Sequence, residues 1–534
     1  MDNSEKIIGS KGLIKKHELI RIIVQCLYSL GYKKSAICLE TESCIYDKSP
    51  EFESLESHIL NARWNECIDS IDKINGLTHE TRASALFLVL EQCLLEFLNS
   101  RHISLALDVL REKVAVLPIE KEDVRKLSYS LLSVKELEFS CMDHDVVHGL
   151  RNRLISQLEK MLPPPIILPE RRLEYLVEMA ICAQIDGCLY HSSSDMISLY
   201  RDHFCNRDQF PTETIQILTD HRDEVWFVQF SNNGEYLASS SSDWTAIIWK
   251  VQDHNEVTQK HVLNGHKSPI SYVAWSPDDT MLLTCGNMEV VKLWDVETGI
   301  CKHTFGGDSF MVSSCAWFPD SKSIFCGSSD PKKGIYEWDC DGKEIRSWKG
   351  MRMPKILDLG VTPDGENLIS IFSDKEIRIW NVSTSAESAK HGSTSLERVI
   401  SEEHCITSLS ISGDGKFLIV NLNSQEIHMW DVAGKWSEPL QYKGHMQQNY
   451  VIRSCFGGLN SMFIASGSED AKVYIWNRRF PTPIEVLSGH GKTVNCVSWN
   501  PKRPQMLASA SDDHTLRIWG PSRQSRQKRE SFSE

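Results

Sequence analysis

The sequence has no apolar run long enough to cross a membrane, and its first residues, MDNSEKIIGS, are polar. A spanning helix needs about 18 apolar residues in a row, and a secretory leader needs an apolar central segment. Although the chain has 17 cysteines, no two stand in a C-x-x-C pair. We therefore expect neither a thioredoxin-type site nor a RING or ribbon zinc framework. Many thiols without a leader predict a reducing compartment, the cytoplasm.

Positive charge is also scarce. The 534 residues include 58 Lys and Arg against 72 Asp and Glu, a formal net charge of −14. Nucleic acids and anionic membranes require clustered basic side chains, so we expect neither as a partner. The most basic stretch, SRQSRQKR, lies in a tail at 521–534 that we expect to be disordered. The alternative interpretation of this stretch is a weak nuclear signal.

Catalytic motifs are missing as well. No G-x-S-x-G elbow occurs, and SGHGKT at 488–493 has Val486 where a phosphate loop needs glycine. The sequence therefore predicts no catalytic residue, no cofactor and no metal site.

Tryptophans recur at near-even spacing through the last three-fifths of the chain. They are Trp249, Trp294, Trp338, Trp380, Trp430, Trp476 and Trp519. A spacing of about 40–50 residues is typical of four-stranded propeller blades. Short alternating apolar runs between Gly, Pro, Asp and Asn predict the strands of each blade. We expect a seven-bladed propeller over 214–520, closed by residues 214–218 as the missing outer strand of the last blade.

Three of the seven units share a polar set at recurring positions. The sets are His221, Ser239, Asp243 and Trp249; His445, Ser466, Asp470 and Trp476; and His490, Ser509, Asp513 and Trp519. In WD-repeat propellers, which this pattern resembles, such residues form a buried hydrogen-bond chain that stiffens a blade. Because the set recurs once per blade, we interpret it as structural rather than as a hydrolase site.

The other four units depart from this pattern. The second keeps His266, Thr284 and Trp294 but has Met288 in place of Asp. The remaining substitutions are Gly307-Asp308 in the third unit, Gly350-Met351 in the fourth, and Glu402 and Ser424 in the fifth. We expect blades three to five to be the softer sector, with an exposed mobile loop at 383–398.

The region before the propeller is predicted to be helical, after a disordered N-terminus at 1–12. Its first segment, 13–45, resembles the LisH dimerisation motif, with a corner at Gly31-Tyr32. The apolar positions expected to oligomerise are Ile20, Ile23, Leu27, Leu30, Ala36 and Leu39. Residues 51–110 resemble the CTLH domain, and 111–205 are expected to hold further helices, the last over 171–204.

A group of cysteines and histidines lies at the junction with the propeller. It comprises Cys182, Cys188, His191, His203 and Cys205. Zinc needs four ligands that converge tetrahedrally, and C-x2-H with H-x-C is not a common spacing. We therefore favour ordinary buried or helix-facing residues over a zinc site.

LisH, CTLH and seven WD repeats follow one another in the order found in the WD-repeat-containing protein 26 family, which the junction at 188–249 also resembles. The resemblance implies a non-catalytic scaffold of the CTLH (glucose-induced-degradation) E3 ubiquitin ligase. It implies homo-oligomerisation through the helices and recruitment of protein substrates or adaptors by the propeller. It also implies other CTLH-complex subunits as partners, including Ran-binding-protein-M-like proteins.

One column of the repeats is expected at the mouth of the ring, one residue past the start of each innermost strand. In it, Trp226, Leu357 and Ile452 are apolar where solvent is expected, and Arg453 follows the last. They are candidates for partner binding, with packing in the channel as the alternative.

Three other functions stay open at this point. A TOPLESS-like transcriptional corepressor also joins LisH and CTLH helices to WD repeats. A cullin-4 substrate receptor would use a W-D-x-R box, which Trp476-Asn477-Arg478-Arg479 approximates. An enzyme housed in a propeller has no residue constellation behind it.

Overall fold

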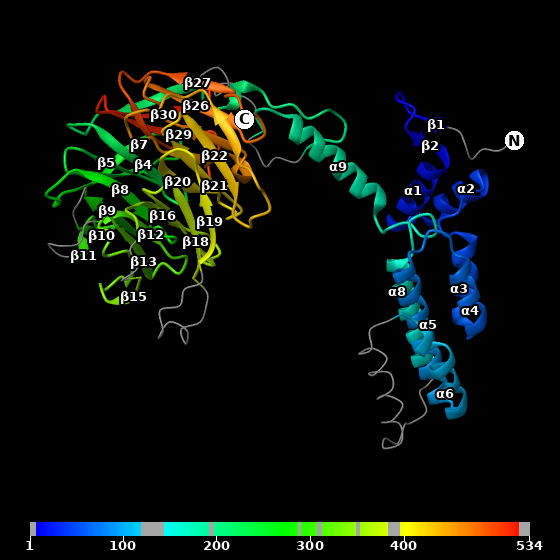
Figure 1. Cartoon of the computed structure of the whole chain (residues 1–534). Helices are drawn as coiled ribbons and strands as arrows, with labels where there is room; N and C mark the ends of the chain where they lie inside the picture. The colour runs from blue at the N-terminus through cyan, green and yellow to red at the C-terminus, as the bar shows by residue number, and fades with distance from the viewer. Residues whose placement is uncertain are drawn as a thin grey trace. The chain divides into compact units, whose positions relative to one another are not determined.

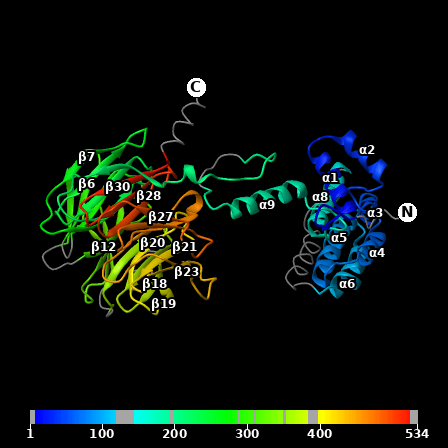
Figure 2. The same ribbon diagram turned by 90° about the horizontal axis from the view of Figure 1, so that it is seen from above.

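The computed structural model describes residues 7–118, 144–191, 197–286, 290–306, 312–348, 353–382 and 396–522. It divides into two compact units, residues 1–183 and 184–534, which Figures 1 and 2 show from two directions. The first unit is helical and the second is a propeller, as the sequence predicts. No helix among the described residues is long and apolar enough to span a membrane.

Eight α-helices and three short 3-10 turns are described. They are α1 (Lys16–Ser29), α2 (Lys33–Ser43), α3 (Pro50–Leu60), α4 (Trp64–Lys73), α5 (His79–Asn99), α6 (Ile103–Glu112), α8 (His144–Met161), α9 (Arg172–Gly187), η1 (Val114–Val116), η2 (Arg207–Gln209) and η4 (Leu459–Ser461). Side-chain caps start α3 and α5, where the hydroxyls of Ser49 and Thr78 accept backbone N–H groups at 3.2 Å. Gly31, at φ +87°, makes the corner between α1 and α2.

The N-terminus needs one correction. Strand β1 (Ile7–Ile8) pairs with β2 (Ile14–Lys15) in an antiparallel hairpin, where disorder was expected up to residue 12. Backbone pairing of two β-branched residues orders this stretch. Residues 1–6 lie outside the described part of the chain.

Helices α3, α4, α5 and α8 share one apolar core. Its fully buried members include Phe52, Leu55, Ile59, Cys67, Ile71, Val89 and Leu158. Arg151 of α8 forms two hydrogen bonds with Glu96 of α5, at 2.8 and 2.7 Å, and lies 5.9 Å from the ring of Trp64. This polar clamp holds α8 against helices that precede it by some fifty residues or more.

The last helix is shorter than predicted. Residues 171–204 were expected to be helical, but α9 ends at Gly187, a residue that lowers helix propensity. Cys188 begins an irregular segment instead, and its N–H bonds the carbonyl of Ile185. This early end decides where the junction cysteines and histidines lie.

Seven four-stranded antiparallel sheets form the propeller. Blades one to three comprise β4 (Val225–Phe230), β5 (Tyr236–Ser241), β6 (Ala246–Val251), β7 (Val257–Leu263); β8 (Ile270–Trp275), β9 (Met281–Gly286), β10 (Val291–Asp295), β11 (Cys301–Phe305); and β12 (Val312–Trp317), β13 (Ser323–Ser328), β14 (Ile335–Asp339), β15 (Glu344–Trp348). Blades four and five comprise β16 (Ile356–Val361), β17 (Asn367–Phe372), β18 (Glu376–Asn381), β19 (Leu396–Ser401); and β20 (Ile406–Ile411), β21 (Phe417–Leu422), β22 (Glu426–Asp431), β23 (Leu440–Lys443). Blades six and seven comprise β24 (Ser454–Gly457), β25 (Phe463–Ser466), β26 (Lys472–Asn477), β27 (Glu485–Ser488); and β28 (Val494–Trp499), β29 (Leu507–Ser511), β30 (Leu516–Gly520), β3 (Glu213–Leu218).

The predicted closure of the ring is confirmed. Strand β3 pairs antiparallel with β30, from Glu213 opposite Gly520 to Leu218 opposite Leu516. The first strands of neighbouring blades pack side by side, as β4 does with β8 and β28. All seven marker tryptophans are buried between blades, so each indole belongs to the inter-blade core.

Several predictions concern residues that the structure does not describe. Met288, Gly307, Asp308, Gly350, Met351 and residues 523–534 lie outside the described residues. So does most of the loop expected at 383–398, but its last residues belong to β19, which pairs with β18. The expectation of a loop is therefore wrong from residue 396 onward.

Candidate functional site

A β-bulge marks the second position of six innermost strands. In blade one the register shifts between Val225 and Phe227, so Trp226 is the extra residue. The bulged residues are Trp226, Ser271, Ser313, Leu357, Thr407 and Asn495. All six line one cavity of about 420 Å³ at the mouth of the ring. A bulge re-aims a side chain away from the ladder, which explains how this column, including Trp226 and Leu357, reaches the mouth.

The prediction is wrong for Ile452. Its side chain is fully buried, as are Val225 and Val494 immediately before the bulge in blades one and seven. Arg453 lines the cavity in its place, and its N–H donates to the carbonyl of Asn495 at 2.8 Å. The residue expected at the mouth in blade six was therefore placed one position too early in the sequence.

Arg453 forms a buried ion pair below the mouth. Its Nη1 lies 2.6 Å from Asp358 Oδ2, and Asp358 is 1% exposed. The guanidinium also lies 4.8 Å from the ring centre of Tyr272. Burial lowers the pKa of Arg453, but Asp358 and Tyr272 outweigh it, so the net direction is upward. The pair joins blades four and six and makes Arg453 part of the wall of the cavity.

The cavity combines apolar and charged groups. Trp226 donates its indole N–H to Glu224 at 3.1 Å, and Asn495 donates to Asp512 at 2.6 Å. Burial, with a further contribution from Glu224, raises the pKa of the Asp512 carboxyl. Tyr450, which also lines the cavity, is 54% exposed. Aromatic residues and arginine are enriched at protein-recognition sites.

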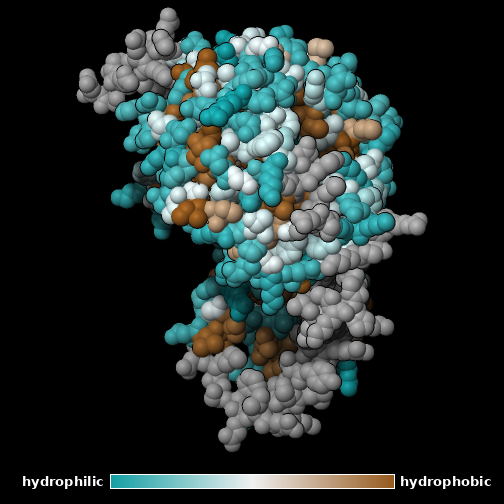
Figure 3. All heavy atoms as spheres, turned by 90° about the vertical axis from the view of Figure 1, so that its left-hand side faces the viewer, coloured by the Kyte–Doolittle hydropathy of each residue, from teal (hydrophilic) through white to brown (hydrophobic). Residues whose placement is uncertain are grey.

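Figure 3 shows how hydrophobic residues are distributed over one face of the molecule. On the face drawn in Figure 3, the described hydrophobic residues form small patches separated by hydrophilic ones. Single exposed apolar side chains are normal on soluble proteins. The mouth cavity, which brings Trp226, Leu357 and Tyr450 together beside Arg453, is the candidate for a partner site on the propeller.

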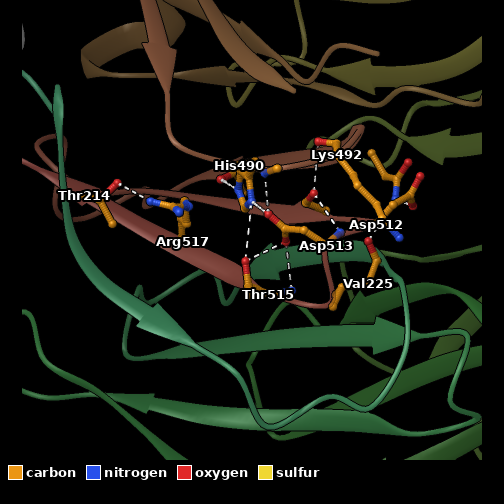
Figure 4. A network of polar contacts seen from close by, with 12 residues as sticks. Thr214, Val225, His490, Lys492, Asp512, Asp513, Thr515 and Arg517 are labelled. Carbon is orange, nitrogen blue, oxygen red and sulfur yellow. Dashed lines mark hydrogen bonds and ion pairs between the residues drawn. The ribbon is translucent and has the colours of Figure 1, made fainter. Parts of the chain in front are cut away.

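Two of the predicted polar sets form complete chains. In blade seven, His490 Nδ1 lies 2.8 Å from Asp513, its Nε2 lies 2.8 Å from Ser509 Oγ, and Trp519 donates to that oxygen at 2.8 Å. Figure 4 shows the imidazole and carboxylate of this set pointing at each other beside Thr515.

Blade one repeats this chain. His221 contacts Asp243 at 3.0 Å and Ser239 at 2.8 Å, and Trp249 donates to Ser239 at 2.9 Å. The hydrogen bond to His221 and those from neighbouring donors outweigh burial and hold the pKa of Asp243 well below its usual range. These contacts are internal and satisfied, which supports the structural interpretation.

The set in blade six does not form. Both ring nitrogens of His445 and one oxygen of Asp470 are buried without a hydrogen-bond partner. Trp476 donates to the carbonyl of Lys443 instead, while Tyr474 donates to Asp470 at 2.8 Å. Tyr474 thus competes for the carboxylate that His445 would need.

A threonine distinguishes the complete sets from the broken one. Thr245 and Thr515, two residues after the Asp, donate to its Oδ1 at 2.6 and 2.7 Å. Blade six has Lys472 at this position, and its Asp470 Oδ1 is the unpartnered oxygen. Sequence reasoning missed this signal, although the sequence shows it.

Shortened or altered chains stabilise other blades. Thr284 of blade two links His266 and Trp294 at 2.7 and 2.8 Å, as predicted. In blade five, Glu402 accepts from Trp430 at 2.6 Å and lies 2.8 Å from His428 Nδ1. Burial opposes protonation of His428, but Glu402 and Glu426 raise its pKa overall. Glu402 therefore replaces the missing histidine rather than leaving a gap.

The junction residues converge, except for one. Sγ of Cys188, a ring nitrogen of His203 and Sγ of Cys205 lie within 4.8 Å of one another. His191 Nδ1 lies 2.9 Å from His203 Nε2, and burial, then His203, lowers the pKa of His191. Cys182 lies on α9, is exposed, and does not belong to this group.

The two arginines of the W-N-R-R stretch have internal contacts. Arg478 lies 4.6 Å from the ring of Phe417, and Arg479 is paired with Asp186. Asn477 donates to the carbonyl of Leu189 at 3.2 Å. These contacts favour a role in packing over one as a cullin-4 adaptor box.

Comparison with known proteins agrees with this architecture. The model described as WDR26 Lis-homology domain matches residues 5–49, and the WD domain, G-beta repeat matches 212–250, 257–295, 299–332, 436–477 and 481–520. The WD repeat-containing protein 26 homolog of Arabidopsis thaliana is 42% identical over 520 residues, 97% of this chain and 86% of its own length. The chain belongs to the WD repeat-containing protein 26 family.

Two further relatives extend over both units. The WD repeat-containing protein WDS homolog of Arabidopsis thaliana is 60% identical over 97% of each chain. GID complex subunit 7 of Schizosaccharomyces pombe is 33% identical over 94% of this chain and 96% of its own. Both alignments therefore include the helices as well as the propeller.

Proposed function

We propose that this chain is a non-catalytic scaffold of a GID/CTLH-type E3 ubiquitin ligase complex and recruits substrates or adaptors for proteasomal degradation. The observation that carries the proposal is the alignment, over nearly the full length of both chains, with the relative named GID complex subunit 7. A match that includes the helices as well as the propeller supports a shared place in an assembly more than a matched propeller alone. Ubiquitin transfer then comes from RING-bearing partner subunits, and the protein acts in the cytoplasm.

The helical unit supplies a surface for self-association. Of the LisH positions, Ile20, Ile23, Leu27 and Leu39 are half-buried and Leu30 is 59% exposed. Ala36 is fully buried, so it packs inside the chain and is not itself a contact residue. A second copy of this motif, or the motif of a Ran-binding-protein-M-like subunit, would cover the uncovered aliphatic face.

Affinity purification of the full chain tests membership of the complex. We expect RING-bearing CTLH subunits to be recovered with it from cell extract. Recovery of DNA-bound repressors without any ligase subunit would support the TOPLESS-like alternative and overturn the proposal.

The recruiting role of the mouth is tested by a matched pair of variants. Trp226→Ala removes the aromatic anchor of the cavity and should reduce recovery of substrates or adaptors roughly tenfold or more, because buried aromatic anchors dominate interfaces. Trp244→Ala is the control, since Trp244 is 52% exposed and outside the cavity lining. Ligase subunits should be recovered equally with both variants. If both variants lose substrates or adaptors equally, the mouth cavity is not the recruiting site.

Self-association is tested by charge. Leu27→Glu with Leu30→Glu should shift the full chain to a smaller species in light scattering while the propeller stays folded. Lys34→Glu, on an exposed side chain, is the control. An unchanged mass for the double variant would contradict the oligomerisation.

A further inference from the structure

We propose that Cys188, His191, His203 and Cys205 form a structural zinc site at the point where the chain enters the propeller. All four residues belong to the propeller unit, which begins at residue 184. Cys188 and His191 lie directly after α9, and His203 and Cys205 lie twelve or more residues later, so the site joins two separate stretches of the chain. This inference does not depend on membership of a ligase complex.

The donor atoms have the separations that zinc needs. With Zn–S bonds of about 2.3 Å and Zn–N bonds of about 2.0–2.1 Å, ligand atoms of a tetrahedron lie roughly 3.3–3.8 Å apart. Cys205 Sγ lies 3.2 Å from His203 Nε2 and 3.6 Å from His191 Nδ1, and the two nitrogens are 2.9 Å apart. Cys188 Sγ completes the group within 4.8 Å of His203 and Cys205. His191 joins the group through His203 and Cys205, and movements on the order of one ångström at Cys188 and His191 would bring all four donors to tetrahedral geometry.

The chemistry of the donors also fits zinc. Two thiolates and two neutral imidazoles are the ligand set of many structural zinc sites. On binding, the two cysteines release their protons to solvent, so the loaded site carries no net charge and can remain partly buried. Cys188 and His191 are already 8% and 7% exposed, which limits the access of water and competing ligands.

Contacts around the group hold the ligands in place. The backbone N–H of His203 donates to Gln184 Oε1 at 2.9 Å, and Gln184 donates to Asp202 at 3.2 Å. Between Cys188 and His191, Tyr190 donates its hydroxyl to Glu485 at 2.9 Å. These contacts fix the backbone at His203 and the short segment between Cys188 and His191.

The site would fix the junction to blade six. Arg207, two residues after Cys205, is paired with the buried Glu485 of β27, and Phe210 packs at 4.9 Å from Phe463. Zinc would add a coordination link to the contacts that already hold this segment against blade six. The competing interpretation of the same geometry needs no metal: His191 and His203 are neutral and form a hydrogen bond with each other beside the two thiols.

Metal analysis of the purified full chain separates the two interpretations. We expect about one zinc ion per chain by mass spectrometry, and a fall of roughly tenfold or more in the Cys188→Ser, Cys205→Ser double variant. Cys182→Ser is the matched control: it removes an exposed thiol outside the group and should retain the metal. Zinc that falls equally in the control, or is unchanged in the double variant, would overturn the site.

A second measurement keeps the test decisive if the double variant misfolds. Replacement of zinc by cobalt in the unaltered chain should give the absorption bands of tetrahedral Co(II) with thiolate charge transfer. Chelation should lower the thermal unfolding midpoint of this chain. A chain that binds neither ion, with an unfolding midpoint indifferent to chelator, refutes the proposal and leaves the hydrogen-bonded histidine pair.

Discussion

Blades six and seven lie next to each other and carry the same four residue types, yet only blade seven links them. His490, Ser509 and Asp513 form a continuous chain, whereas His445 has no hydrogen-bond partner on either nitrogen. The difference shows that these four residue types alone do not predict the hydrogen-bond chain; the residues around them must also be considered. A threonine donor and the absence of a competing tyrosine decide whether the buried carboxylate reaches the imidazole.

The approach to the strand differs as well. Val494 begins β28 four residues after His490, but Ser454 begins β24 nine residues after His445. The longer segment of blade six contains Gln447, a fully buried side chain that donates to Thr407 at 2.8 Å. Blade six thus lacks the hydrogen-bond chain of blade seven but forms a hydrogen bond to blade five near the mouth of the ring.

The largest expected effect comes from deleting the central hydroxyl of each set. Ser509→Ala leaves the indole of Trp519 and the imidazole of His490 without their shared partner and should lower the free energy of unfolding by about 2–4 kcal/mol. Ser466→Ala removes a donor to the Gly467 carbonyl and should cost about 1 kcal/mol or less. Urea unfolding of the full chains measures both. Equal losses would show that the two sets contribute alike.

The pH dependence should also separate neighbouring blades. Burial lowers the pKa of His445 to about 4, although Gln447 and Asp470 raise it slightly. An unfolded histidine takes up its proton near pH 6.5, whereas folded His445 stays neutral. Above pH 6.5 both states are neutral, and the free energy of unfolding is not reduced by this residue. As pH falls from 6.5 toward 4, the free energy of unfolding decreases by about 2–3 kcal/mol.

His445→Asn should flatten this part of the stability profile in thermal unfolding at a series of pH values. His254→Asn, at an exposed position, should leave the slope as it is. The pKa of His428 in blade five is raised, so its contribution has the opposite sign: it is present below pH 6.5 and lost as pH rises through the folded pKa. A wild-type slope in the His445 variant would contradict the assignment.

The smallest expected effect is a repair of blade six. Lys472→Thr offers a hydroxyl to the unpartnered oxygen of Asp470 and should raise the free energy of unfolding by about 0.5–1 kcal/mol. Thr515→Val in blade seven should lower it by about 1 kcal/mol, because Asp513 keeps the backbone N–H of that residue. Calorimetry on both variants provides the check. If Lys472→Thr does not raise the free energy of unfolding, the competing hydrogen bond from Tyr474 is sufficient to keep His445 and Asp470 apart.

The sequence predicts the fold well because its strongest signals are periodic. The seven tryptophans fix the blade number, and Glu213–Leu218 is identified as the closing strand because the last repeat lacks one. Blade five was expected to be soft, but Glu402 supplies an alternative hydrogen-bond chain. Such compensation depends on a residue outside the motif and is not visible from the motif alone.

Local placement was harder to predict than architecture. Ile452 and Arg453 were one residue out of register because the innermost strand of blade six begins only at Ser454 and, unlike the other six, has no bulge at its start. The convergence at Cys188 and His203 depends on where α9 ends and how the following chain folds back. Neither is encoded in sequence spacing, so the junction could not be assigned before its geometry was known.

The pairing of β3 with β30 ties the first element of the propeller to its last. During synthesis, β3 is made some three hundred residues before β30 and cannot complete blade seven until β30 has left the ribosome. A product truncated inside the last repeat keeps two open sheet edges, which invite pairing with other chains. Protection of these edges therefore depends on the last repeat being present to its final strand.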